Sequence, residues 1–182
     1  MAILIAIDDG HGKDTPGKRT PSISGIGSIQ ENTFNKAVAR FLDIELKRCG
    51  INTLMVAPTD ADTSLQARTN LANARKASIY VSIHYNAGGG SGVETYHYPG
   101  STSGKRLASI IHKYVIQGTA QVNRGVKSAN FHVLRETSMP AALIEFGFMD
   151  SPDLVEARLM VNTAFQKECA VEVAKGICEY LG

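Results

Sequence analysis

Residues 3–12 read ILIAIDDGHG, an uninterrupted apolar run that ends in two aspartates, a glycine, a histidine and another glycine. A continuous run rich in β-branched residues is typical of a strand that is covered on both faces of a sheet. Ligands bind outside the carboxyl ends of the strands in open α/β sheets, so side chains that directly follow such a strand are candidate site residues. The stretch therefore predicts a buried first strand within residues 1–7, with His11 just beyond its carboxyl end.

The rest of the chain alternates between the patterns of strands and of helices. Apolar residues at helical spacing predict helices at residues 31–48, 62–74, 107–115 and 165–177, and the pair Ser151-Pro152 marks a further helix start. Short apolar runs predict strands at residues 51–56, 79–83, 131–134 and 141–144, and an alternating run predicts an edge or half-exposed strand at 92–98. This order implies an α/β fold, a single-domain three-layer sandwich whose twisted, mostly parallel sheet is flanked by helices.

Composition excludes several classes of protein. The chain has 182 residues, which fits one domain, and its 43% apolar and 20% charged residues exclude a disordered chain. Nineteen Lys and Arg residues against 17 Asp and Glu residues give a net charge of +2, so we expect no nucleic-acid partner. No apolar stretch approaches the roughly 18 residues that a membrane span requires, so we expect no membrane insertion.

The cysteines and the amino terminus predict neither a disulfide framework nor a signal peptide. Cys49, Cys169 and Cys178 lie far apart in apolar helical patterns, so we expect small core residues and not a disulfide framework or a zinc knuckle. The apolar amino terminus is short, lacks basic residues and runs directly into Asp8 and Asp9. The sequence therefore predicts no signal peptide.

Three side chains with ligating or catalytic chemistry each follow a predicted strand directly: His11, His84 and Glu145. The carboxyl ends of parallel strands meet at one edge of a sheet, so we expect these groups to converge, and two imidazoles with a carboxylate suit a catalytic zinc ion. Each residue alone also fits a structural role. A histidine at a strand end can hydrogen-bond at the surface, Glu145 can form a buried ion pair, and Glu31 at a helix start is favoured by the helix dipole.

Five ordered motifs carry a resemblance to a known family. They are residues 8–12 (DDGHG), Glu31 at a helix start, residues 81–87 (VSIHYNA), residues 92–96 (GVETY) and residues 140–148 (PAALIEFGF). In this order, and over essentially the whole chain, the sequence resembles the zinc-dependent N-acetylmuramoyl-L-alanine amidases, the amidase_3 family of cell-wall hydrolases. Coincidence of five motifs in order is improbable.

The resemblance implies a site and a reaction. It implies one Zn²⁺ per chain, held by His11, Glu31 and His84, and Glu145 as the catalytic carboxylate. The reaction would be hydrolysis of the amide between N-acetylmuramic acid and L-alanine in bacterial peptidoglycan, with a metal-activated water and with Glu145 as general base and then general acid. Asp8 matches an aspartate of the family's first strand, and we expect it either to accept the free ring N–H of His11 or to hydrogen-bond the turn.

The chain also departs from the family pattern. After the GHG motif it reads KDTPGKR at residues 13–19, where the family often has another Gly and an Asp-x-Gly stretch, and Tyr85 stands where Ala is common. Neither change touches an implied ligand, so both concern the fit of the substrate. Lys13, Lys18 and Arg19 are interpreted either as contacts for anionic wall polymers or peptide carboxylates, or as a solvated loop.

Other residues receive narrower expectations. Glu94 and Asn86 match motif positions and are expected to line the cleft, and Arg68 is expected to brace the fold through carboxylate or carbonyl contacts. His132 and Arg135 are expected on a strand near the site, where a substrate contact and a surface role are equally open. His97 and His112 are expected to be ordinary exposed or half-exposed residues.

Two rival functions stay open at this stage. A zinc carboxypeptidase usually places His and Glu two residues apart in one motif, and His11 has no such neighbour. A catalytically silent wall-binding module would lack part of the set of four site residues. We therefore interpret residues 1–182 as an amidase catalytic domain with no separate wall-binding module, monomeric by default. We expect it to act on the cell wall, and three settings stay open: a phage endolysin, an autolysin released by lysis, or an excised domain of a secreted protein.

Overall fold

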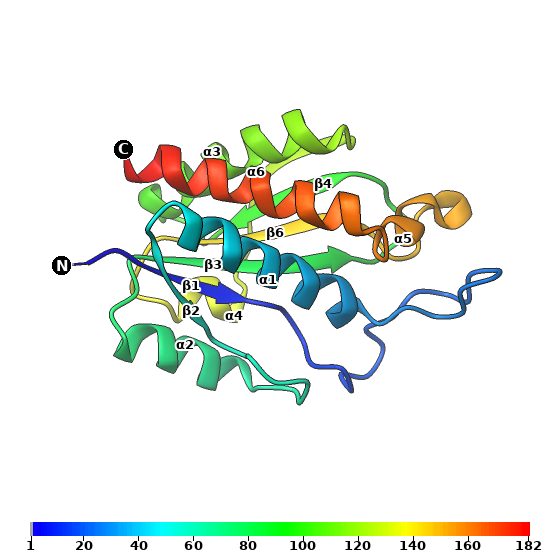
Figure 1. Ribbon diagram of the computed structural model, residues 1–182, viewed down its shortest axis with the longest axis horizontal. Helices are drawn as coiled ribbons and strands as arrows, with labels where there is room; N and C mark the ends of the chain where they lie inside the picture. The colour runs from blue at the N-terminus through cyan, green and yellow to red at the C-terminus, as the bar shows by residue number, and fades with distance from the viewer. Residues whose placement is uncertain (1) are drawn as a thin grey trace.

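A six-stranded sheet with the order β2-β1-β3-β6-β4-β5 forms the centre of the protein, as seen in a computed structural model that describes residues 2–182 (Figure 1). The strands are β1 (Leu4–Asp8), β2 (Asn52–Met55), β3 (Ile79–Asn86), β4 (Val93–His97), β5 (Asn123–Ser128) and β6 (Ala141–Phe148). All neighbouring strands run parallel except β4 and β6, which are antiparallel. The predicted first strand is confirmed, while Met1 lies outside the described residues.

Helices cover both faces of this sheet. They are α1 (Glu31–Arg48), α2 (Leu65–Ala74), α3 (Thr102–Thr119), α4 (His132–Arg135), η1 (Pro152–Leu154), α5 (Val155–Leu159) and α6 (Thr163–Leu181). The larger core lies between the sheet and α1, α3 and α6, and a smaller one lies between the opposite face and α2 and α4. The α/β fold with a mostly parallel sheet between helices is therefore confirmed.

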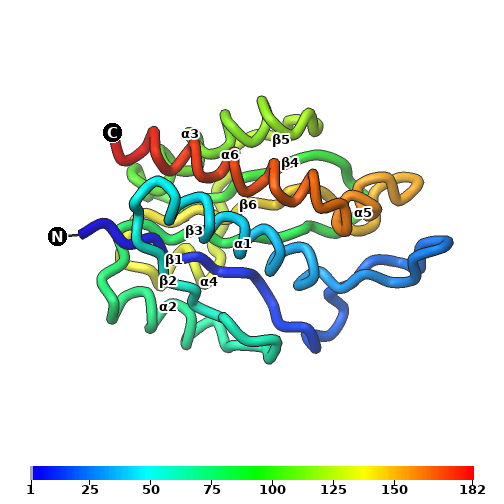
Figure 2. Tube along the Cα trace, viewed as in Figure 1, coloured from blue at the N-terminus to red at the C-terminus, as the bar shows by residue number. Residues whose placement is uncertain are grey.

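Alternation along the strands produces the two cores. Ile5 and Ile7 of β1 belong to the larger core, whereas Ala6 between them belongs to the smaller one. Successive side chains of a strand point to opposite faces, so a run that is apolar at every position is buried on both sides. The carboxyl ends of β1, β3 and β6 then share one edge, and the long loop between β1 and α1 extends from it, away from both chain termini (Figure 2).

Three strand predictions need correction. Residues 131–134 form no strand, because His132–Arg135 is the short helix α4, and a short apolar run does not distinguish a buried helical turn from a strand. The sequence missed β5, whose residues are largely polar and half-exposed. Because β5 pairs with β4, β4 is not an edge strand, and four of its five residues are buried.

Buried histidines and exposed cysteines correct two further expectations. His97 and His112 are buried, at 8% and 6% exposure. The two ring nitrogens of His112 lie 2.9 Å from Thr95 Oγ1 and 2.8 Å from Asn123 Oδ1, so this histidine ties α3 to β4 and β5. Of the three cysteines, only Cys169 is fully buried. Cys49 directly follows the last residue of α1 and is exposed, and Cys178 is half-buried. Within residues 2–182, no helix combines the length and the apolar character that crossing a membrane requires.

Candidate active site

A tight turn after β1 places His11 at the carboxyl edge of the sheet. Gly10 and His11 both have left-handed backbone conformations, with φ of 37° and 57°. A Cβ on Gly10 would lie 2.6 Å from the carbonyl oxygen of Ile83, so only glycine fits there. The left-handed conformation costs a non-glycine residue about 1–2 kcal/mol. Asn32 Nδ2 and Arg68 Nη2 donate to the carbonyl oxygen of His11 at 3.0 and 3.2 Å and hold this turn.

His11, Glu31 and His84 come together in space, from the turn after β1, the start of α1 and the end of β3. One donor atom from each lies within 4.8 Å of the others. His11 Nε2 is 3.4 Å from Glu31 Oε2, and His84 Nδ1 is 3.1 Å from Glu31 Oε1. Ligands about 2.0–2.1 Å from a tetrahedral zinc ion are separated by about 3.3 Å. The two histidine–carboxylate separations, each to a different oxygen of Glu31, are close to this value.

The protonation states of His11 and Glu31 suit a cation, whereas at His84 burial opposes protonation but the hydrogen bond and charge of Glu31 outweigh it and raise the pKa of the imidazole. Burial lowers the pKa of His11 to about 4, so its imidazole is neutral at pH 7. Burial opposes ionisation of Glu31, but the hydrogen bond and charge of His84 outweigh it and lower the pKa of Glu31 to about 2. Metal binding requires neutral imidazole and ionised carboxylate. Glu31 Oε1 accepts from the Asn35 side chain and from the Tyr85 amide, both at 3.1 Å, while the buried Oε2 accepts no hydrogen bond within residues 2–182.

A chain of hydrogen bonds orients His84. Ser82 Oγ donates to Asp8 Oδ2 at 2.7 Å and lies 3.1 Å from His84 Nε2. Because the Ser82 proton is given to Asp8, the serine oxygen accepts from Nε2–H, and this bond holds the ring with Nδ1 toward Glu31 Oε1, 3.1 Å away. Ser82 precedes His84 by two residues and shares its face of the strand. The sequence analysis missed this residue, although the period of two could have found it.

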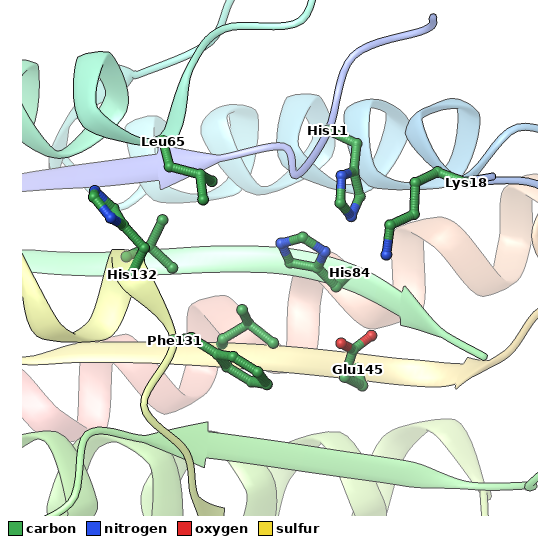
Figure 3. Close-up of a pocket in the computed structure, with 9 residues that line it drawn as sticks. His11, Lys18, Leu65, His84, Phe131, His132 and Glu145 are labelled. Carbon is green, nitrogen blue, oxygen red and sulfur yellow. The ribbon is translucent and has the colours of Figure 1, made fainter. Parts of the chain in front are cut away.

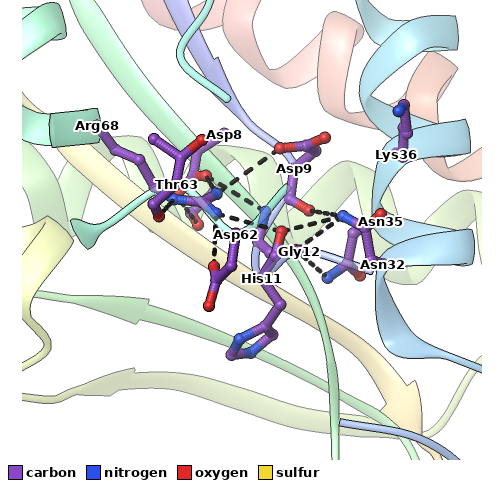
Figure 4. A network of polar contacts seen from close by, with 12 residues as sticks. Asp8, Asp9, His11, Gly12, Asn32, Asn35, Lys36, Asp62, Thr63 and Arg68 are labelled. Atoms are coloured by element: carbon purple, nitrogen blue, oxygen red, sulfur yellow. Dashed lines mark hydrogen bonds and ion pairs between the residues drawn. The ribbon is translucent and has the colours of Figure 1, made fainter. Parts of the chain in front are cut away.

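Asp8 does not accept the ring N–H of His11, so that expectation is wrong. Its carboxylate accepts instead from Arg68 Nη1, the Tyr80 hydroxyl, Ser82 Oγ and the Gly10 amide. Figure 4 shows Asp8 facing Arg68 while the ring of His11 points away from both. Asp8 therefore accepts the Gly10 hydrogen bond in the turn, the other role expected of it, and also positions His84 through Ser82.

Arg68 braces this network, as the sequence predicted. Its side chain is 1% exposed and pairs with Asp8. Arg68 Nε donates to the carbonyl oxygen of Thr63 at 2.8 Å, and Nη2 donates to that of His11. One side chain thereby joins α2, β1 and the His11 turn.

We expect Arg68→Met to lower the free energy of unfolding by about 3–5 kcal/mol, because it leaves the buried Asp8 carboxylate without its partner. Urea unfolding monitored by circular dichroism measures this loss. The matched control is Arg75→Met at the exposed end of α2, which should change stability by less than about 0.5 kcal/mol. Equal small losses in the two variants would contradict a bracing role.

Glu145 lies beside the cluster on β6. In the parallel register it is the partner of His84, so both side chains point to the same face. Burial raises the pKa of Glu145 to about 7, and its buried Oε2 accepts no hydrogen bond within the described chain. Its carboxylate points toward His84 in a cavity of about 230 Å³ (Figure 3). The cavity is lined by His11, Lys18, Leu65, His84, Phe131, His132, Val133, Leu143 and Glu145.

Glu94 faces Glu145 across the antiparallel pair of β4 and β6, but it does not line this cavity. Its carboxylate is held by Lys127, by Arg124 Nε at 2.7 Å and by the Tyr96 hydroxyl at 2.5 Å. Asn86 donates to the same carboxylate and is likewise absent from the lining. Glu94 and Asn86, which were expected to line the cleft, therefore lie outside the cavity. The reason is that Arg124 and Lys127, on the strand β5 that the sequence analysis missed, bind the Glu94 carboxylate.

Glu94→Gln should destabilise the protein in a pH-dependent way. Burial opposes ionisation, but hydrogen bonds from Lys127, Tyr96 and Arg124 outweigh it and lower the pKa of Glu94 to about 2. The stabilisation is therefore complete above the ordinary pKa of 4.5 and is lost as pH falls toward 2. We expect a loss of about 1–3 kcal/mol at pH 7 that shrinks steadily between pH 4.5 and 3. Urea unfolding across this range checks it, with the exposed Glu168→Gln as control; a loss independent of pH would contradict it.

The remaining candidates separate in space. His132 lines the cavity, and its buried Nε2 forms no hydrogen bond within residues 2–182. Arg135 is exposed and pairs with Glu136 Oε1 and with Asn130 Oδ1. Lys18 points into the cavity, whereas Lys13 and Arg19 are exposed outside it. The structure therefore places His132 at the cavity and Arg135 at the surface.

Comparison with known proteins identifies the family. The family model described as N-acetylmuramoyl-L-alanine amidase matches residues 5–179. The chain belongs to this amidase family, Amidase_3. The amidase is 39% identical over 178 residues to the sporulation-specific N-acetylmuramoyl-L-alanine amidase of Bacillus subtilis (strain 168), covering 96% of this chain and 67% of the relative. It is 33% identical to the endolysin of Bacillus phage SPP1, covering 100% of this chain and 67% of that protein.

A solved structure agrees with this membership. The crystal structure of N-acetylmuramoyl-L-alanine amidase from Clostridium difficile 630 superimposes on the amidase with a TM-score of 0.90 at 31% sequence identity. The match covers 99% of this chain and 97% of the other. The resemblance found in the sequence is therefore confirmed at the level of family, enzyme class and fold.

Proposed function

We propose that this amidase hydrolyses the amide between N-acetylmuramic acid and L-alanine of peptidoglycan with one zinc ion, held by His11, Glu31 and His84, and with Glu145 as general base and acid. One observation carries the proposal: one donor atom each of His11, Glu31 and His84 lies within 4.8 Å of the others, and Glu145 lies beside them with a buried oxygen that accepts no hydrogen bond within the described residues.

The donor set supports zinc over calcium and magnesium. Two imidazoles and one carboxylate suit zinc, whereas calcium and magnesium prefer oxygen ligands alone. Three protein ligands leave one position open, as catalytic zinc sites do. The chemistry that zinc would supply when held by these residues is polarisation of the scissile carbonyl and a lower pKa of water, from 15.7 toward about 7. The Asp8–Ser82–His84 chain and the bonds to Glu31 Oε1 fix two of the donors before any ion binds.

Glu145 moves the proton in this proposal. Its raised pKa of about 7 lets the carboxylate accept a proton from the attacking water and release it again near neutral pH. A carbon–oxygen bond forms at the lactyl carbonyl, the carbon–nitrogen bond breaks, and Glu145 delivers the proton to the departing nitrogen of L-alanine. The products are a lactyl carboxylate and a peptide with a free amino terminus.

Four of the other residues that line the cavity are apolar. Leu65 and Phe131 stay 52% and 39% exposed at its mouth, and Leu143 lies deeper. The ring of Phe131 packs edge-on against Tyr96, with 5.2 Å between the centroids, which fixes its position. We infer that these groups contact the sugar ring and the lactyl methyl group and exclude bulk water from the scissile amide.

Identification of the newly formed chain ends in digested peptidoglycan tests the function. Free amino groups on L-alanine, together with about one zinc per chain by elemental analysis, are the expected result. Newly released carboxyl-terminal amino acids would instead indicate a carboxypeptidase, and binding without release would indicate a silent wall-binding module. The endolysin and the sporulation-specific amidase among the relatives support action on a bacterial cell wall.

A further inference from the structure

Lys18 is a charged group in the cavity that the proposed hydrolysis does not use. Its side chain is half-buried and points between His11, His84 and Glu145 (Figure 3). Within residues 2–182 its ammonium group forms neither an ion pair nor a hydrogen bond. The positive charge of Lys18 helps to lower the pKa of both His11 and Glu145, in agreement with its place beside them.

The backbone holds Lys18 in this position. Its carbonyl oxygen accepts from the amide of Glu31 at 2.9 Å, so the residue is tied to the start of α1, where a member of the cluster lies. The next residues continue this contact, because Arg19 pairs with Gln30 and the Thr20 amide donates to the carbonyl oxygen of Ile29. The ammonium group is therefore presented to the cavity by an ordered segment.

The charges around Lys18 favour an anionic ligand. The three-residue cluster holds one carboxylate, that of Glu31, and Glu145 is the one carboxylate among the residues that line the cavity. Once a divalent cation occupies the cluster, its two positive charges and that of Lys18 exceed the charges of these two carboxylates. The cavity then has a surplus of positive charge with Lys18 on one wall. A lysine in such a setting binds a carboxylate as a point charge.

We propose that Lys18 binds the α-carboxylate of the second stem-peptide residue and makes the enzyme selective for peptidoglycan in which that group is free. The inference rests on the proposed function. L-Alanine is bonded to the amino group of D-glutamate, and the stem continues from D-glutamate through its γ-carboxyl group, so this α-carboxylate is the first anion beyond the scissile amide. It lies within about 7 Å of that amide, since a residue spans at most about 3.6 Å. In many cell walls it is converted to a neutral amide.

Matched substrates test this selectivity. One is N-acetylmuramoyl-L-Ala-γ-D-Glu-L-Lys amide, and the other carries D-isoglutamine in place of D-glutamate, so the pair differs only in the α-carboxylate. We expect the wild type to show at least about a tenfold higher kcat/KM for the free carboxylate, the effect of one charge-assisted hydrogen bond. Lys18→Gln should lose this preference by slowing only the acidic substrate, and Lys18→Arg should retain it. Lys13→Gln, in the exposed part of the same loop, is the control.

A binding measurement separates this inference from the proposed function. Calorimetry on the protein with added zinc compares L-Ala-γ-D-Glu-L-Lys amide with its isoglutamine counterpart, and Lys18→Gln should weaken only the first. If the wild type cleaves neither substrate, the proposed function fails while the calorimetry still decides the role of Lys18. Equal slowing of both substrates by Lys18→Gln would overturn the inference and place Lys18 at the reacting carbonyl. An unchanged preference in that variant would overturn it as well.

Discussion

Replacing Glu145 with glutamine should lower kcat by about 10²–10⁴-fold, because an amide of the same size cannot accept the proton of the attacking water. Zinc content should stay at the wild-type level, since Glu145 lies outside the three-residue cluster of donor atoms. Steady-state kinetics on a soluble muramyl peptide and elemental analysis after dialysis measure the two quantities. The fold should be retained, because glutamine keeps the volume of the side chain and relieves the cost of a buried carboxylate.

Glu136→Gln provides the matched control for this substitution. Glu136 is exposed and follows α4, and its carboxylate pairs with Arg135 away from the cavity. This variant should keep wild-type turnover. Wild-type turnover in Glu145→Gln as well would remove Glu145 from the mechanism, and loss of zinc in that variant would make it a ligand.

Replacing His84 with alanine should abolish both zinc retention and hydrolysis. The change removes one of three donor groups and leaves the Glu31 carboxylate with a single imidazole partner, His11. Zinc per chain after dialysis should fall well below one, and activity should fall to the level of the buffer control. Circular dichroism establishes that the variant is folded before these values are compared.

A second histidine serves as the control for this experiment. His97 is buried on β4 and bonds the carbonyl oxygen of Tyr98 through Nδ1, outside the cluster. His97→Gln should therefore retain zinc. Stoichiometric zinc in dialysed His84→Ala would contradict the proposed ligand set directly, whatever the activity of that variant.

Local patterns were sufficient to predict the central strands and the edge that carries the site. The apolar runs before His11, His84 and Glu145 correspond to β1, β3 and β6, and parallel strands bring their carboxyl ends together. Local patterns do not single out Glu31 as a site residue, because the helix dipole alone favours a glutamate at the start of a helix. It was assigned through the resemblance to the family, and the structure places it between the two histidines.

Hydrophobic periodicity is a local property, so the α/β class, the order of the main elements and the edge at which the chemistry gathers could be predicted from the sequence alone. The partners of Asp8, which come from positions 68, 80 and 82, and the entry of Lys18 into the cavity are visible only in the folded protein. The short segment at 131–134 and the polar strand β5 were decided there too. Hydrogen bonds and burial between residues far apart in the chain depend on how the layers pack, and no local pattern records that packing.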